Sequence, residues 1–137
     1  MPLFYISSQA LLSVYATGNT TGLAIEIGDG ITQIVPVSGG FTLKHASCKI
    51  ELAGRDVTEF LVDTIYLGNY NISDTAIYEI VREMKEDVCK VAMDYELEVK
   101  NYQGKDGFQE RYKLPDGNIF EIKGQCLMAP ELMFQPK

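Results

Sequence analysis

Hydrophobic positions with a period of two predict a pair of β-strands in the first third of the chain. Leu23, Ile25 and Ile27 alternate with smaller or polar residues, as in a strand that buries one face. β-branched residues are frequent over 31–35 and are typical of a return strand. Between the two, Gly28-Asp29-Gly30 predicts a tight turn whose glycines allow positive φ and let the backbone come close to a ligand without a Cβ in the way. Asp-Gly is also the commonest hairpin turn, so this stretch alone favours a purely structural hairpin.

The predicted turn has groups that suit an anion and a cation together. Successive backbone N–H groups in such a turn converge on anionic oxygens, as phosphate-binding nests do. Asp29, with Glu26 three residues earlier, supplies carboxylate oxygens that can reach a divalent cation through water. The turn is therefore a candidate site for a metal-bound phosphate, beside its structural interpretation.

Turn signals and longer-period patterns predict further elements on both sides of this hairpin. A helix is predicted to begin after a cap at Ser7 or Ser8 and to end at Gly18. Gln9 falls in its first turn and is either a surface glutamine or an amide that orients a water. The other predicted elements are a strand over 48–52, helices over 57–65, 74–88 and 91–99, a mobile polar loop over 101–109, a second hairpin over 112–122 around Pro115-Asp116-Gly117, and a tail over 128–137 that is too apolar to face solvent.

Three charged residues share one side of the predicted helix over 74–88. Arg82, Lys85 and Glu86 are three and four residues apart, which places them together on a helix surface. Such a set is usually a solvated face that carries an ion pair. A binding role is the alternative, and spacing alone does not require it.

Composition narrows the class of protein and of partner. The 137 residues suffice for one globular domain, and a hydrophobic content of 46% argues against disorder. A net charge of −7 repels phosphates and anionic lipid, so neither nucleic acid nor a membrane is expected as a partner. Three separated cysteines and a single histidine, His45, favour reduced thiols and offer few catalytic or zinc-binding combinations. With no secretory leader and no apolar run of membrane-spanning length, a cytoplasmic location is expected.

Short motifs, taken in order, resemble the actin family. The motifs are QALLSVYATG over 9–18, GDGIT over 28–32, LAGRD over 52–56, EIVREMKE over 79–86, LPDG over 114–117 and APELMFQP over 129–136. Their order and spacing carry the resemblance, which covers essentially the whole chain. The chain resembles the middle and later part of an actin and corresponds to well under half of one.

The resemblance implies a site for ATP or ADP with Mg²⁺. The positions implied to bind nucleotide are Gly28, Asp29, Gly30 and Ile31 in the family's second phosphate-binding hairpin, and Gly54, Arg82, Lys85 and Glu86 around the adenosine part. Asp29 matches a carboxylate that acts on the waters of the metal. Gln9 matches the glutamine that positions the attacking water.

Departures from the family pattern bear on catalysis. Glu26-Ile27 stands where the family has Asp-Ser, so a phosphate-side hydroxyl is lost and the carboxylate lies one methylene further out. Gln33 stands where actin has a histidine near the catalytic water. Gln9, Glu26 and Gln33 are therefore the candidate catalytic residues, although a displacement of about 1 Å can cost about 100-fold in rate. Nothing matches the family's first phosphate loop, so we expect no hydrolysis by the chain alone.

The expected fold is α+β. Residues 1–52 would form a partial actin-like sheet of the ribonuclease-H type, and 53–137 a small helical lobe resembling the adenosine-side subdomain. The leading hypothesis is an actin-like cytoskeletal protein, or a fragment, that assembles with other actin or actin-like subunits and actin-binding proteins. The alternative is an ATP-hydrolysing actin-related protein whose missing cleft wall comes from another chain, and a more distant one is the sugar-kinase and chaperone ATPase superfamily. Apolar surface is expected to be exposed, or covered by a partner, where missing strands would pack.

Overall fold

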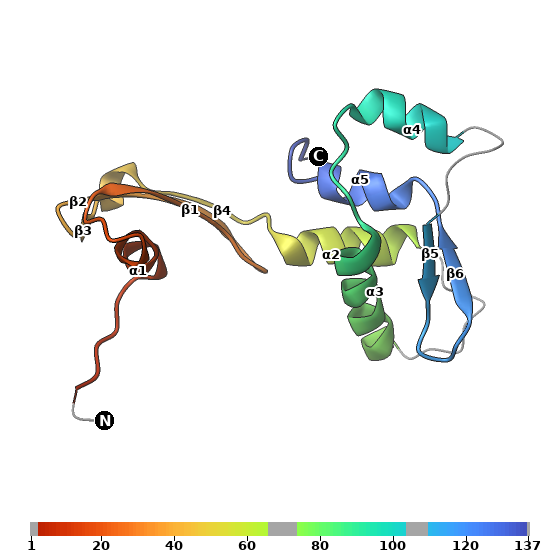
Figure 1. Cartoon of the computed structure of the whole chain (residues 1–137), viewed down its shortest axis with the longest axis horizontal. Coiled ribbons are helices and arrows are strands. Elements are labelled where there is room, and N and C mark those ends of the chain that lie inside the picture. The colour runs from red at the N-terminus through yellow and green to blue at the C-terminus, as the bar shows by residue number, and fades with distance from the viewer. Residues whose placement is uncertain (1–2, 66–73, 104–109, 137) are drawn as a thin grey trace. The chain divides into compact units, whose positions relative to one another are not determined.

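The computed structural model describes residues 3–65, 74–103 and 110–136. It divides the chain into two compact units, Met1–Gly54 and Arg55–Lys137 (Figure 1). Each unit has an antiparallel sheet and at least one helix, so the expected mixed α+β class is confirmed. No helix in these described ranges is long and apolar enough to cross a membrane.

The first unit is a four-stranded antiparallel sheet backed by a helix. β2 (Thr32–Ser38) is central; β1 (Gly22–Ile27) pairs along one side of it, while β3 (Phe41–Thr42) and β4 (Cys48–Ile50) pair along the other. A short 3₁₀ helix over Lys44–Ala46 links β3 to β4. β1 pairs only with β2, so it is an edge strand within the described part of the chain.

The helix α1 (Gln9–Ala16) covers the face of the sheet opposite to the one that the pattern predicts. The small core beneath it consists of Ala10, Val14, Ala24, Val35 and Val37. Leu23, Ile25 and Ile27 point the other way and are 60%, 61% and 65% exposed, so the expectation that they are buried is wrong. Small residues line the helix side of β1: a Cβ on Gly22 would lie in ordinary contact with a Val14 methyl group, at 3.7 Å, and Ala24 follows two residues later. The helix approaches closely only where the strand side chains are short.

The connection between β1 and β2 is a four-residue loop, 28–31. Ile27 pairs with Thr32, and the Gly28 N–H donates to the Ile31 carbonyl at 3.0 Å. Neither Gly28 nor Gly30 has positive φ, so the loop does not use the left-handed conformation that glycine allows. Loops of this length are most often built around a type I turn, which keeps φ negative.

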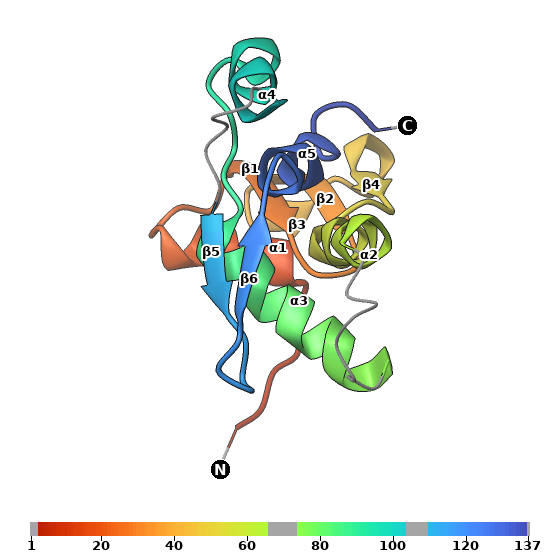
Figure 2. The same ribbon diagram turned by 90° about the vertical axis from the view of Figure 1, so that its right-hand side faces the viewer.

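The second unit packs helices around a hairpin and a larger core. Its elements are α2 (Gly54–Thr64), α3 (Asp74–Val88), α4 (Tyr95–Gln103), β5 (Glu110–Lys113), β6 (Ile119–Ile122) and α5 (Gln125–Glu131). The largest fully buried side chains include Leu61, Met84, Leu114, Ile122 and Leu127. Figure 2 shows the β5–β6 hairpin alongside α3. The predicted Pro115-Asp116-Gly117 turn is confirmed, with Gly117 at a φ of 89°.

Three predicted elements have different limits in the structure. The helix predicted over 91–99 begins at Tyr95, because the Asp94 carboxylate accepts the N–H of Leu97 at 3.1 Å and caps the helix there. It continues to Gln103, so the start of the predicted loop over 101–109 is helical, and 104–109 lie outside the described residues. The strand predicted over 48–52 ends at Ile50. The apolar tail packs only in part, since Phe134 is exposed.

Candidate functional site

The Gly-Asp-Gly turn presents its backbone to solvent. Gly28, Asp29 and Gly30 are all exposed, and no atom lies within 4 Å of the position that a Cβ on Gly30 would take. Ile31 is half-buried and holds the end of the loop against the first unit. A ligand could therefore reach the turn without displacing a side chain, as an amide-based anion site requires.

The carboxylate of Glu26 is held from two sides. The Ser13 hydroxyl of α1 donates to one oxygen at 2.6 Å, and the Gln33 amide of β2 donates to the other at 2.5 Å. Glu26 and Gln33 are opposite each other in the β1–β2 register, so the structure brings two of the predicted catalytic residues together. Each carboxylate oxygen has a second acceptor position, so Glu26 can still bind a water or a metal-bound water.

Ser13 is a contact that the sequence analysis missed. It lies four residues after Gln9, so the two residues share one side of α1. Gln9 is exposed near the start of that helix. The i, i+4 spacing was the available signal, but only the structure shows that this side of the helix reaches Glu26.

Gly54 and Gly28 are also brought together. The N–H of Gly54 donates to the carbonyl of Gly28 at 3.0 Å, and the Thr32 hydroxyl donates to the carbonyl of Leu52 at 2.7 Å. These bonds tie the segment that enters α2 to the base of the β1–β2 loop. Two positions that the resemblance assigns to different parts of the nucleotide are thus neighbours.

The three charged residues of α3 have separate partners within the second unit. Arg82 forms exposed ion pairs with Glu79 and Glu86, at 3.6 Å and 3.8 Å. Lys85 instead donates from Nζ to the hydroxyl of Thr58 at 2.9 Å. Arg82 and Glu86 therefore form the solvated ion pair that their spacing suggests, whereas Lys85 links α3 to the buried side of α2.

The three cysteines differ in burial, and one has a raised pKa. Burial, together with the nearby Cys126, raises the pKa of the Cys89 thiol to about 12 against the opposing effect of Lys85, so Cys89 is protonated at neutral pH and is a poor nucleophile. All three cysteines are free thiols, as expected. His45 is exposed, and no group of three His, Cys, Asp or Glu side chains that could hold a metal occurs among the described residues.

These features define a mixed α+β protein in which a helix-backed sheet with an open glycine turn is followed by a helical unit with a second hairpin. A comparison with models of protein families identifies the family of the chain. The family model described as Actin matches residues 1–137, and the chain belongs to the actin family. Its antiparallel sheets and five described α-helices are consistent with part of an actin-like fold.

Proposed function

We propose that the chain is an actin-like cytoskeletal protein, or a fragment of one, that supplies one wall of an Mg-ATP cleft and acts in assembly. The observation that carries the proposal is the exposed Gly-Asp-Gly turn, in a chain that belongs to a family whose members generally bind Mg-ATP. The chain then corresponds to the middle and later part of an actin. Its setting would be the cytoplasm and its partners actin or actin-like subunits with their binding proteins.

The residues at the turn suit the phosphate end of such a ligand. The N–H of Gly28 already donates to the Ile31 carbonyl, so amides further along the turn, such as that of Gly30, would face phosphate oxygens. The exposed Asp29 carboxylate would accept hydrogen bonds from waters around the ion. Oxygen donors that act through water are the usual environment of Mg²⁺, which would neutralise phosphate charge when bound. Gln9 and the held pair Glu26–Gln33 would orient a water on the protein side.

Of the four positions that the resemblance assigns to the adenosine part, Gly54 lies beside the turn. Gly54 is favourably placed because it bonds to Gly28 at the base of the turn. Arg82, Lys85 and Glu86 already have partners on α3 and α2, so a ligand would have to share them or displace them.

One wall cannot enclose a nucleotide, and this sets the expected affinity. Ligand sites usually bury roughly 70–90% of a small ligand, whereas the turn described here is open to water. Titration of the 137-residue chain with a fluorescent ATP analogue should therefore show no Mg²⁺-dependent saturation at micromolar ligand. Saturable, Mg²⁺-dependent binding in that range would overturn the proposal of a half-site.

The assembly role has a separate test. The chain should sediment with actin filaments, and the amount bound should saturate as filaments are added. A chain that stays in the supernatant at every filament concentration would refute the cytoskeletal role.

A second candidate function is ATP hydrolysis with the missing wall supplied by another chain. It is favoured by the position of Glu26, which Ser13 and Gln33 hold on the α1 side of the sheet. It predicts phosphate release from ATP when the chain is mixed with an actin-like partner, above that of the partner alone. Asp29→Asn should remove the increment, whereas Asp116→Asn, in the Asp-Gly turn of the β5–β6 hairpin, should not. Equal effects of both variants, or no increment at all, would exclude this function.

A further inference from the structure

The edge strand β1 lacks most of the features that keep natural sheet edges from pairing, with Glu26 as its one charged residue. It runs for six residues in unbroken register with β2, and it contains neither proline nor lysine. Its single charge, Glu26, is held by Ser13 and Gln33. Soluble proteins usually protect edges with bulges, prolines, lysines or short length, since a long bare edge accepts another strand.

Both flanks of this edge could receive the side chains of an added strand. On one flank a groove of about 310 Å³ runs between α1 and β1, lined by the apolar Val14 and Ala24 and by polar residues that include Ser13, Thr17 and Glu26. On the other flank lies the open face of the sheet, which consists of Leu23, Ile25, Ile27, Ile34, Pro36 and Ile50. An extended segment alternates its side chains between two faces, so an apolar one would fill the groove and extend the open face together.

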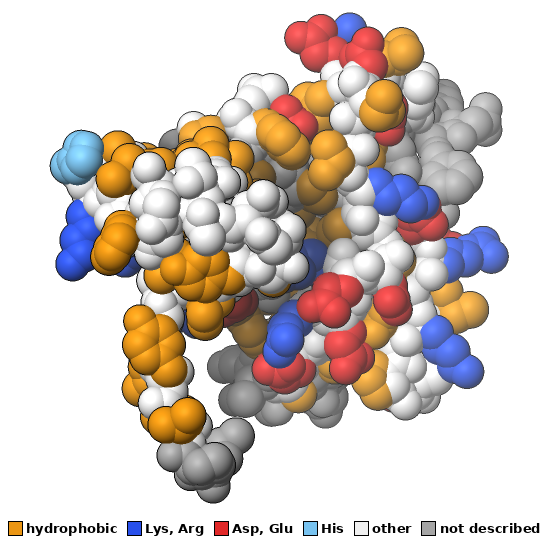
Figure 3. Space-filling model, turned by 60° about the vertical axis from the view of Figure 1, so that its left-hand side comes forward, with side chains coloured by type: hydrophobic (Ala, Val, Ile, Leu, Met, Phe, Trp, Pro, Cys, Tyr) orange, Lys and Arg blue, Asp and Glu red, His pale blue; other side chains and the backbone are white. Residues whose placement is uncertain are grey.

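The chain carries an extended apolar segment of suitable length. Residues 3–6, here called the arm, are Leu-Phe-Tyr-Ile, and their side chains are between 78% and 89% exposed. Four extended residues span about 14 Å, against about 20 Å for the six residues of β1. Ser8 has an extended backbone, with φ −61° and ψ 136°, and the arm runs away from α1 and from the sheet of its own unit (Figures 1 and 3).

We propose that two copies of this chain exchange arms, so that residues 3–6 of each copy pair with the free edge of β1 in the other. Such an exchange is two-fold symmetric and satisfies backbone groups on both edges. The four arm side chains offer roughly 150 Å² each, or about 1,200 Å² for two copies before the receiving strands are counted. A stable protein interface buries about 1,200–2,000 Å² in total, so the exchanged arms and their receiving strands suffice.

The distribution of charge along the chain favours pairing of two copies through their first units. In the first unit the acidic residues are Glu26, Asp29 and Glu51 and the basic residues are Lys44 and Lys49, so almost all of the net charge of −7 lies in the second unit. The arm itself is uncharged apart from any chain terminus. Two copies therefore meet with little repulsion through the first unit, whereas contact through the second would bring like charges together.

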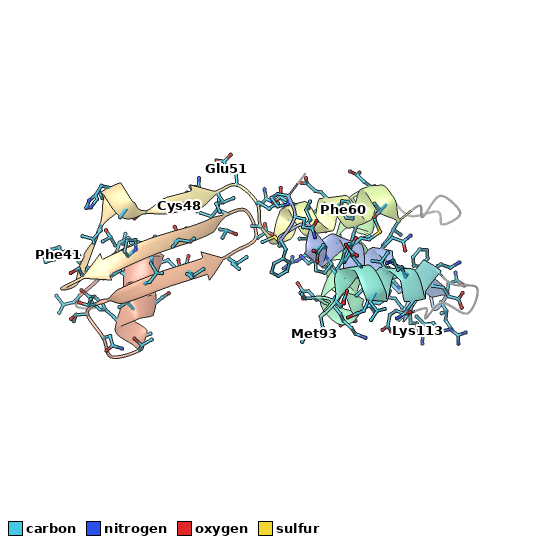
Figure 4. All side chains as sticks on the ribbon, turned by 90° about the horizontal axis from the view of Figure 1, so that it is seen from above. Phe41, Cys48, Glu51, Phe60, Met93 and Lys113 are labelled. Carbon is cyan, nitrogen blue, oxygen red and sulfur yellow. The ribbon has the colours of Figure 1, made fainter. Side chains whose placement is uncertain are left out.

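The oligomeric state of the 137-residue chain tests the proposal without nucleotide, so its outcome is independent of the Mg-ATP proposal. Sedimentation equilibrium should give twice the chain mass of 15.3 kDa. The double variant Phe4→Asp/Ile6→Asp should weaken the dimer by at least about 100-fold, because charged side chains replace buried apolar ones at both ends of the exchange. Phe41→Asp is the matched control, because Phe41 is 78% exposed, against 80% for Phe4. Phe41 projects from β3, which β2 separates from the receiving strand β1 (Figure 4). This control should leave the dimer intact.

A second pair of variants tests the receiving edge. Ile25→Lys places a lysine on β1 and should also give a monomer, while Ile119→Lys, at a similarly exposed position on β6, should not. Unchanged circular dichroism shows that each variant is folded. A monomeric wild-type chain would overturn the proposal, even if hydrogen exchange showed β1 protected by its own arm. So would a dimer that survives the arm variant, or an open series of larger aggregates.

Discussion

The β1–β2 and β5–β6 hairpins bury their side chains in opposite ways. In the first unit, the β1–β2 hairpin gives its small residues to the covering helix and leaves Leu23, Ile25 and Ile27 in solvent. In the second, β5 and β6 bury Tyr112 and Ile122 in a core that helices share. The second unit is therefore stabilised largely by its own core, whereas the first keeps a surface that another chain segment could cover.

The core of the second unit should show the largest mutational effect. Leu61→Ala removes a side chain that is 1% exposed and should lower the free energy of unfolding by about 2–5 kcal/mol. Leu23→Ala in the first unit removes the same atoms from a 60% exposed side chain and should change stability by less than about 1 kcal/mol in the monomer. Urea denaturation of the two variants makes the comparison. Equal losses would show that the open face of the sheet is buried in solution.

The two glycine turns should respond differently to a methyl group. Gly117 has a φ of +89°, so Gly117→Ala should cost about 1–2 kcal/mol through backbone strain. Gly30 has no positive φ, and nothing lies within 4 Å of the place where its Cβ would be, so Gly30→Ala should be close to neutral for stability. Thermal unfolding of each variant measures the difference. A costly Gly30→Ala would mean that the loop conformation described above is wrong.

The charged side of α3 should show a smaller contrast. Lys85→Met removes the donor to the buried hydroxyl of Thr58 and should cost about 1 kcal/mol. Arg82→Met breaks only exposed ion pairs and should cost less than about 0.5 kcal/mol. Chemical denaturation of the two variants in parallel measures the difference between their free energies of unfolding. The reverse order would indicate that Arg82 has a role beyond the surface of its helix.

Thiol reactivity should differ between the units with little effect on stability. Cys48 is exposed, whereas Cys89 is partly buried with a pKa of about 12 and Cys126 is buried. A thiol reagent near pH 8 should label Cys48 alone in the native chain and all three cysteines after unfolding. Because the pKa of Cys89 is raised in the folded state, its contribution to stability is complete below about pH 9 and is lost as pH rises towards 12. Rapid native labelling of Cys89 would contradict this environment.

Local signals in the sequence were sufficient for much of the fold. Apolar spacing predicted α2 and α3, and the Pro-Asp-Gly signal predicted the β5–β6 hairpin, because periodicity and turn chemistry act over a few residues. The start of α4 was missed because the apolar pattern begins before Asp94, whereas the Asp94 side chain caps the helix and sets its start at the next residue. Which face of the sheet α1 covers depends on how closely the helix can approach the strands. The alternation of residues along a strand does not contain that information.

The candidate site was less predictable than the fold. The exposed turn agrees with the sequence hypothesis, whereas the lack of positive φ at Gly28 and Gly30 could not be told from glycine's identity, which allows either sign of φ. Ser13 could be associated with Glu26 only after the helix and strand were placed together. The nucleotide roles of these residues depend on the family resemblance and stay predictions.

The hydrogen bond between Gly54 and Gly28 has a consequence for how the loop can move. The donor is the N–H of the first residue of α2, and the acceptor is the carbonyl at the base of the loop. Rotation of the peptide plane between Gly28 and Asp29 would break this bond. A peptide flip in the loop would therefore also take the acceptor from the first N–H of α2.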